Sequence, residues 1–171
     1  PNSVTSIGNS AFEGTSLLTS LTIGNSVETI GTYTFKSSNF TSIIIVGSIT
    51  SVGTGSFTGV PLTTVVMNSN NNNVVFGTVF SGITSITTVT FDFAGTIPAN
   101  SCTSVTSLTS VTIGNTVTSI GNLAFKSCTG LTSLTFTPTS TLTVIGEDAF
   151  GYCSVLTSVT IPDTVTTIDN L

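Results

Sequence analysis

Hydrophobic residues recur along this chain in two short blocks that return about every 23 residues. One block is a phenylalanine with an aliphatic residue five places earlier, as in Ile7 and Phe12. The other has the form of Leu18 to Ile23, where apolar residues take the first, fourth and sixth places. All three can point inward only if the last residues are extended with a period of two. The pattern therefore predicts one short strand per repeat, and these strands should form a parallel sheet.

Two independent columns keep nearly the same period, which excludes an accident of composition. The anchor column holds Phe12, Phe35, Phe57, Phe80, Cys102, Phe125 and Phe150. The strand block ends at Ile23, Ile45, Met67, Phe91, Ile113, Phe136 and Ile161. A fixed period of roughly 20 to 29 residues with such a block is the signature of a leucine-rich-repeat solenoid. We expect one mainly β domain, a right-handed solenoid of about seven and a half repeats of 22–25 residues, with its parallel sheet along one face.

The predicted repeats are 1–23, 24–45, 46–67, 68–91, 92–113, 114–136 and 137–161, followed by a partial one at 162–171. Val4 and Ile7, three residues apart, predict an opposite wall made of a turn-like segment rather than a strand. A glycine follows this segment in most repeats, at Gly8, Gly31, Gly53, Gly121 and Gly146. We expect these glycines to turn a corner with positive φ.

The unit I-G-x-x-A-F-x-x-C-x-x-L-T-S-V-T-I resembles the BspA-like class of leucine-rich repeats. Phe125, Cys128, Leu131 and Ile161 occupy positions of that pattern, and the resemblance spans essentially the whole chain, most weakly over 68–105. It implies a surface or secreted protein involved in adhesion to host proteins or other cells. The ligand is not implied, because a fold does not fix a function.

Composition narrows the classes of partner and the location. Lys36 and Lys126 are the only basic residues, the net charge is −5 and the pI is about 4.1. Nucleic acids and anionic lipid surfaces are excluded as partners because both require clustered Lys or Arg. No apolar run approaches the ~18 residues of a membrane span. The abundance of serine and threonine, with almost no site for trypsin-like proteases, predicts an extracellular or cell-surface location.

We predict no catalytic residue, cofactor or metal site. Histidine, the commonest general base, is absent. Glu147 and Asp148 are adjacent, but neighbouring side chains in a turn diverge, so we interpret them as a solvated corner. The three cysteines are far apart and have no histidine partner, so there is no zinc motif. The chain is therefore expected to be non-catalytic.

The outward positions of the predicted strands form the candidate binding face, with a protein or a glycan as ligand. They are Ser20, Thr22, Thr88, Thr90, Ser110, Thr112, Ser133, Thr135, Ser158 and Thr160. Threonine also suits exposed strand positions for structural reasons alone, and that alternative stays open. Flat threonine rows suggest ice binding as a weaker alternative, but Ile44 and Val66 interrupt the rows.

The two ends of the sequence suggest another class of function. The most regular repeats lie near both ends, and the sequence stops in mid-repeat. We therefore expect either an excerpt of a longer array or a subunit whose open ends join other copies. The second case would make the protein a structural, self-assembling filament subunit joined by β-edge pairing.

Three local features complete the prediction. Asn39-Phe40-Thr41 has the pattern of an N-glycosylation acceptor. Cys128 and Cys153 share a column in successive repeats and form a candidate disulfide, with buried free thiols as the favoured alternative. Cys102 lies in another column and is expected to be unpaired. The asparagine run 68–73 is expected to form an exposed loop.

Overall fold

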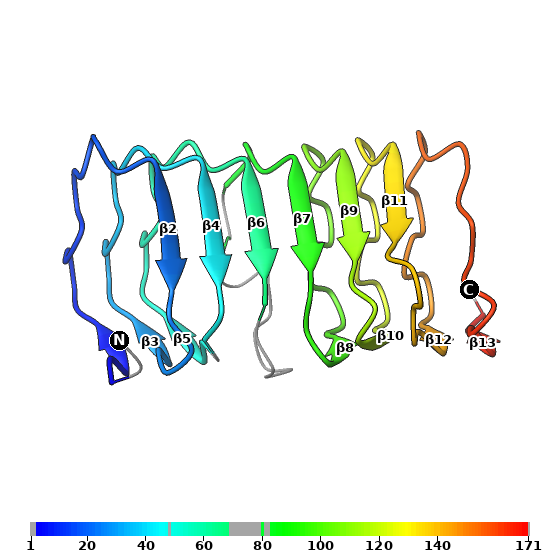
Figure 1. Ribbon diagram of the computed structural model, residues 1–171. Coiled ribbons are helices and arrows are strands. Elements are labelled where there is room, and N and C mark those ends of the chain that lie inside the picture. The colour runs from blue at the N-terminus through cyan, green and yellow to red at the C-terminus, as the bar shows by residue number, and fades with distance from the viewer. Residues whose placement is uncertain (1–2, 48, 69–79, 81–82, 171) are drawn as a thin grey trace.

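The computed structural model describes residues 3–47, 49–68, 80 and 83–170. These residues form a solenoid of short parallel strands and turns (Figure 1). We call one full turn of the solenoid, which corresponds to one sequence repeat, a coil. One sheet contains six strands of four residues each. They are β2 (Ser20–Ile23), β4 (Ser42–Ile45), β6 (Thr64–Met67), β7 (Thr88–Phe91), β9 (Ser110–Ile113) and β11 (Ser133–Phe136). The strands follow each other in chain order and all pairs are parallel. The predicted β solenoid with a parallel sheet along one face is confirmed.

Equivalent residues of successive repeats lie directly beside each other in this sheet. Leu21 pairs with Ile43, Ile43 with Val65, and the same register continues to β11 without a shift. The second and fourth residues of each strand face the core, and the first and third face outward. Each column of the sequence pattern thus becomes a row of side chains along the solenoid.

The opposite wall also consists of short parallel strands. The first sheet there contains β1 (Ser6–Ile7), β3 (Thr29–Ile30) and β5 (Ser51–Val52). The second contains β8 (Gly95–Ile97), β10 (Val117–Ile120), β12 (Val144–Ile145) and β13 (Thr167–Ile168). The prediction of a turn-like segment was wrong because stacking pairs even two extended residues with their equivalents, as when the Gly31 N–H donates to the Ile7 carbonyl (2.8 Å).

Glycine recurs at one position of the repeat for a different reason from the positive φ that we expected. None of the five predicted corner glycines has positive φ. The positive φ falls two residues later, at Ser10, Tyr33, Leu123 and Asp148 among others. A Cβ on Gly121 would lie 2.6 Å from the main-chain nitrogen of Ala99, in the preceding coil. Glycine is therefore needed so that successive coils can approach each other closely.

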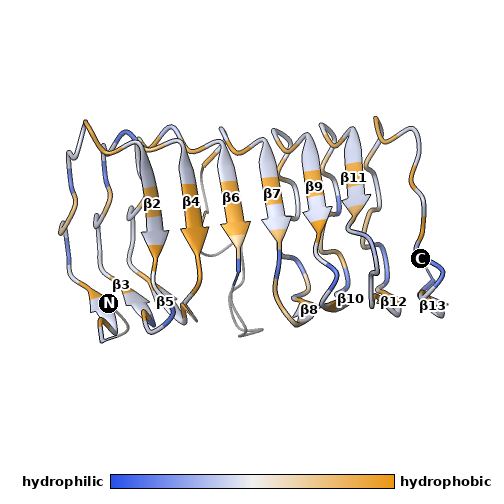
Figure 2. Ribbon diagram, in the orientation of Figure 1, coloured by the Kyte–Doolittle hydropathy of each residue, from blue (hydrophilic) through white to orange (hydrophobic). Residues whose placement is uncertain are grey.

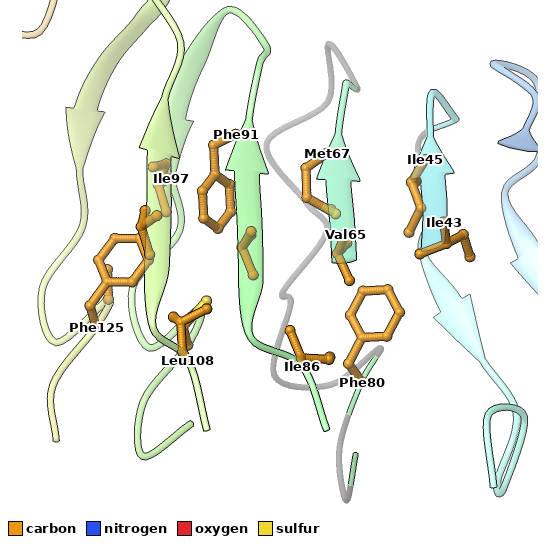
Figure 3. Packing of buried hydrophobic residues seen from close by; sticks show 14 of the residues in the cluster. Ile43, Ile45, Val65, Met67, Phe80, Ile86, Phe91, Ile97, Leu108 and Phe125 are labelled. Carbon is orange, nitrogen blue, oxygen red and sulfur yellow. The ribbon is translucent and has the colours of Figure 1, made fainter. Parts of the chain in front are cut away.

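A row of aromatic rings fills the interior between the two walls. The Phe35 ring lies 5.6 Å from the Phe12 ring and 5.3 Å from the Phe57 ring, centroid to centroid. Cys102 interrupts the row as a fully buried side chain, and the Phe125 ring resumes it by stacking on Phe150. Figure 3 shows Phe80, Phe91 and Phe125 among the aliphatic side chains of the sheet. Full burial of a ring such as that of Phe35 or Phe125 contributes about 2 to 3 kcal/mol to stability.

The seventh repeat departs from the six before it. The strand predicted at 158–161 does not form, and no main-chain hydrogen bond joins this described segment to β11. In earlier repeats the residue after the strand donates its N–H to the preceding coil, as Gly114 does to Phe91 and Thr137 to Ile113. Pro162 occupies this position after 158–161, and proline has no N–H to donate. β11 therefore remains an edge strand.

Candidate binding face

The outward side chains of the six long strands form a surface two columns wide, which we call the strand face. The first column holds Ser20, Ser42, Thr64, Thr88, Ser110 and Ser133. The second column holds Thr22, Ile44, Val66, Thr90, Thr112 and Thr135. The register places each residue beside its equivalent in the next strand, about 4.8 Å away. The first column is therefore an unbroken row of hydroxyl groups.

Most of the predicted binding residues lie together on this surface. The strand face contains Ser20, Thr22, Thr88, Thr90, Ser110, Thr112, Ser133 and Thr135. Ser158 and Thr160 do not join it, because segment 158–161 is not paired with β11. The prediction also missed Ser42 and Thr64, which complete the first column and could have been found from their place in the repeat.

Hydroxyl groups on the strand face have no hydrogen-bond partner within the described residues. The threonine just before β6, β7, β9 or β11 behaves differently. Its hydroxyl donates to the carbonyl of the equivalent residue in the preceding coil, as from Thr63 to Thr41 (3.1 Å) and from Thr109 to Thr87 (3.1 Å). The abundance of threonine thus has two origins. One row of hydroxyls ties coils together, and the strand face leaves its own hydroxyls available to a ligand.

A small apolar patch interrupts the second column of the strand face. Ile44 and Val66 lie beside each other in register, between Thr22 and Thr90. Ile44 is 40% exposed. Figure 2 shows β4 and β6 as hydrophobic beyond their pale first part, whereas the neighbouring strands alternate between pale and orange. The strand face is otherwise uncharged and contains no aromatic residue.

Both lysines of the chain join neighbouring coils. Lys36 Nζ lies 3.1 Å from Glu13 Oε1 and over the Tyr33 ring (4.9 Å to its centroid). Hydrogen bonds from Ser10 and then Lys36 lower the pKa of Glu13 below its ordinary value. Lys126 Nζ lies 2.5 Å from Asp148 Oδ2 and over the ring of Tyr152 (5.4 Å).

The remaining acidic residues are exposed and form no ion pair within the described part of the chain. They are Glu28, Asp92, Glu147, Asp163 and Asp169. Because both lysines already neutralise a carboxylate, the surface outside the strand face is acidic. This distribution provides no cluster of positive charge that could bind phosphate groups.

The adjacent carboxylates Glu147 and Asp148 have different surroundings. Glu147 is exposed, whereas Asp148 is half-buried and bound to Lys126. The described residues contain no group of three or more His, Cys, Asp or Glu side chains that could hold a metal ion. They also contain no helix long and apolar enough to cross a membrane.

Cysteines 102, 128 and 153 are free thiols in the structure. The Cys153 thiol donates to the Phe125 carbonyl of the preceding coil (3.3 Å). Burial raises the pKa of Cys128 to about 12, with a smaller contribution from Cys153. Cys128 is buried and Cys153 is half-buried, and whether the two form a disulfide or remain free thiols stays a prediction.

The glycosylation pattern and the asparagine run lie on either side of the third repeat. Asn39 is exposed just before β4, so its side chain is accessible to modification, and glycosylation stays a prediction. Asn68 is exposed, and its N–H donates to the Ile45 carbonyl (2.8 Å). The rest of the run, 69–73, lies outside the described residues.

Comparison with solved structures identifies bacterial leucine-rich-repeat proteins as similar folds. A leucine-rich repeat protein from Eubacterium ventriosum is 25% identical with a TM-score of 0.59, over 88% of this chain and 41% of that protein. A leucine rich cell surface protein from Faecalibacterium prausnitzii is 23% identical with a TM-score of 0.47, over 97% of this chain and 53% of that protein. The chain thus spans less than half of the first structure.

Comparison with curated proteins finds no match. The family model of the BspA type leucine rich repeat region matches six copies, over residues 1–98 and 95–171. These matches cover the strands of both walls and the aromatic row, and they agree with the repeat unit seen in the sequence. The chain therefore belongs to the BspA type leucine-rich-repeat family.

Proposed function

We propose that this chain is a non-catalytic module of an extracellular or cell-surface protein that binds a protein ligand through the strand face. Leucine-rich-repeat domains generally bind proteins and are generally non-catalytic, and the family suggests a protein-interaction or surface role. The observation that carries the proposal is the arrangement of the strand face. Hydroxyl groups without partners among the described residues surround the apolar pair of exposed Ile44 and half-buried Val66.

A protein ligand fits this surface better than a glycan. Recognition of a sugar ring usually uses an aromatic side chain as a flat apolar support, and the strand face has none. An apolar centre with a polar rim is instead the usual anatomy of a protein interface. Because the strand face is uncharged, binding should depend weakly on salt concentration.

Two charge variants test the location of the binding surface. Thr112→Glu places a carboxylate on the strand face, and Thr118→Glu places one at an exposed position of β10 on the opposite wall. The chain and both variants are applied, with a label, to arrays of purified extracellular proteins and of glycans. We expect binding to one or more proteins, lost in T112E and kept in T118E.

A second variant tests the apolar centre. The double variant I44S/V66T completes the hydroxyl rows without adding charge, and we expect it to weaken protein binding by about tenfold. Binding to glycans alone, or equal binding by T112E and T118E, would contradict the proposal. End-to-end assembly into a filament stays a prediction, which sedimentation at several protein concentrations would test. The break at Ile44 and Val66 gives no support to ice binding.

A further inference from the structure

A groove of about 560 Å³ follows the free edge of β11. One side is lined by Leu134, Thr135 and Phe136, and the other by Ser158, Val159 and Thr160. In Figure 1 the last coil stands away from β11, whereas the earlier strands are evenly spaced. The volume falls in the range of about 300 to 1,000 Å³ that is usual for ligand sites.

Main-chain groups of β11 point into this groove and have no hydrogen-bond partner in the part of the chain that the structure describes. In a parallel sheet, alternate residues bond to opposite neighbours. The Ser133 N–H donates to the Thr109 carbonyl (3.0 Å), so the main-chain groups of Leu134 face away from β9, toward the groove. Phe136 faces the same way, and Pro162 opposite it cannot donate a hydrogen bond. The edge therefore offers alternating N–H and C=O groups, which an extended peptide satisfies.

The side chains in the groove add a second requirement. Leu134 and Phe136 are only half-buried, whereas their equivalents in β9, Val111 and Ile113, are fully buried by the next coil. Leu134 and Phe136 thus lack the apolar cover that stacking provides elsewhere. An occupant that pairs with β11 would supply this cover with apolar side chains two residues apart.

Charge further restricts the occupant. Asp163 is the one charged residue among those that line the groove. Both lysines are engaged elsewhere in the solenoid. An acidic peptide would therefore be repelled, whereas a neutral or basic one would not.

We infer that the groove beside β11 binds an extended segment of a partner protein as an added β-strand, with apolar side chains at two alternate positions and no acidic residue. This site adjoins the strand face at Thr135, and the inference does not depend on the function proposed for that surface. The alternative occupant is segment 158–161 of the chain itself, which would close the groove.

Peptide binding and amide hydrogen exchange test the inference on the whole chain. The probe is a synthetic peptide with the β9 sequence SVTI between flanking lysines. The control is the same peptide with alternate main-chain nitrogens methylated, which removes the donors that strand pairing needs. We expect the unmodified peptide to slow exchange at the Leu134 and Phe136 amides by about tenfold or more, and the methylated peptide to bind at least about tenfold more weakly.

Two proline variants locate the effect in the groove. Pro162→Thr restores an N–H opposite the Phe136 carbonyl and should draw 158–161 onto β11, which weakens peptide binding by about tenfold. Pro61→Thr changes an exposed proline distant in sequence and should leave binding unchanged. The inference is overturned by any of four results: protected Leu134 and Phe136 amides in the free protein, absence of peptide binding, equal binding of the methylated peptide, or unchanged affinity in P162T. The variant I44S/V66T should bind this peptide normally, which separates this test from that of the strand face.

Discussion

The Cys128 thiol donates a hydrogen bond to the main-chain carbonyl of Cys102 in the preceding coil, with Sγ and O 3.1 Å apart. Ser38 holds the equivalent position in the second repeat, and its hydroxyl donates to the Phe12 carbonyl (2.7 Å). A thiol and a hydroxyl thus form the same bond between coils. This equivalence gives Cys128 a structural role that needs no disulfide.

The burial of Cys128 predicts low reactivity in the folded protein. Its pKa of about 12 leaves almost no thiolate at pH 8, and the thiolate is the form that iodoacetamide attacks. We expect no labelling of Cys128 in the native protein within the time that labels a free thiol, and labelling of all three cysteines in denaturant without reductant. Mass spectrometry of both samples measures this, and a pair of cysteines that resists labelling in denaturant would indicate a disulfide.

The same thiol should make stability fall at alkaline pH. An unfolded cysteine ionises near the ordinary value of 9.0, whereas folded Cys128 stays protonated up to about 12. Between these values the unfolded state has lost protons that the folded state keeps, so the free energy of unfolding decreases as the pH rises. Urea unfolding at several pH values from 8 upward measures the slope. Cys128→Ser keeps the hydrogen bond, removes the titration, and should show a shallower decrease.

Replacing a glycine that touches the preceding coil should destabilise the protein more than replacing a glycine at the equivalent position of a coil where it has no such neighbour. Gly121→Ala places a Cβ within 2.9 Å of three main-chain atoms of the preceding coil, and backbone cannot move aside easily. We expect a loss of about 3 kcal/mol in the free energy of unfolding. Gly8→Ala is the matched control, because nothing lies within 4 Å of its Cβ. Equal effects of the two substitutions in urea unfolding would contradict this explanation.

The sequence was sufficient to predict the features that repeat in every coil. The columns ending at Ile23 and Ile113 located the long strands, and the alternation within each block separated the core from the strand face. The place of Ser20 and Thr112 on one surface follows from the same register. These features depend on the order of polar and apolar side chains, which can be read from the sequence.

Features that arise from contact between coils could not be predicted in this way. Two-residue strands such as Thr29–Ile30 are held by main-chain hydrogen bonds to neighbouring coils. The side chains of two residues are too few to show a strand pattern in the sequence. Position 121 requires glycine because a Cβ there would collide with main-chain atoms that include the nitrogen of Ala99, more than twenty residues earlier. The loss of strand pairing at 158–161 depends on Pro162, because the equivalent residues Gly114 and Thr137 donate their N–H groups to the preceding coil. The sequence does not show that this position needs a donor.

The two lysine pairs should differ in importance although they look alike. The Glu13 side chain is 37% exposed, so water can replace Lys36 after Lys36→Met. The Asp148 side chain is only 16% exposed, and its Oδ1 has no hydrogen-bond partner among the described residues. Lys126→Met would leave this carboxylate without its counterion. We expect a clearly larger fall in the thermal midpoint for K126M than for K36M, and the reverse order would show that the pairs do not act through burial.

The row of threonines before the strands should contribute to stability, in contrast to the threonines of the strand face. The Thr109 hydroxyl donates to the Thr87 carbonyl (3.1 Å), and the next coil repeats this bond from Thr132 to Thr109 (3.1 Å). Thr109→Val removes the donor while keeping the shape and the branched Cβ, so we expect a loss of about 1 kcal/mol in the free energy of unfolding. Thr112→Val, three residues later, removes a hydroxyl that has no internal partner and should change stability by less than about 0.5 kcal/mol. Urea unfolding of both variants measures the difference. Because valine favours strands as much as threonine does, strand propensity predicts equal effects, and only the hydrogen bond between coils predicts unequal ones.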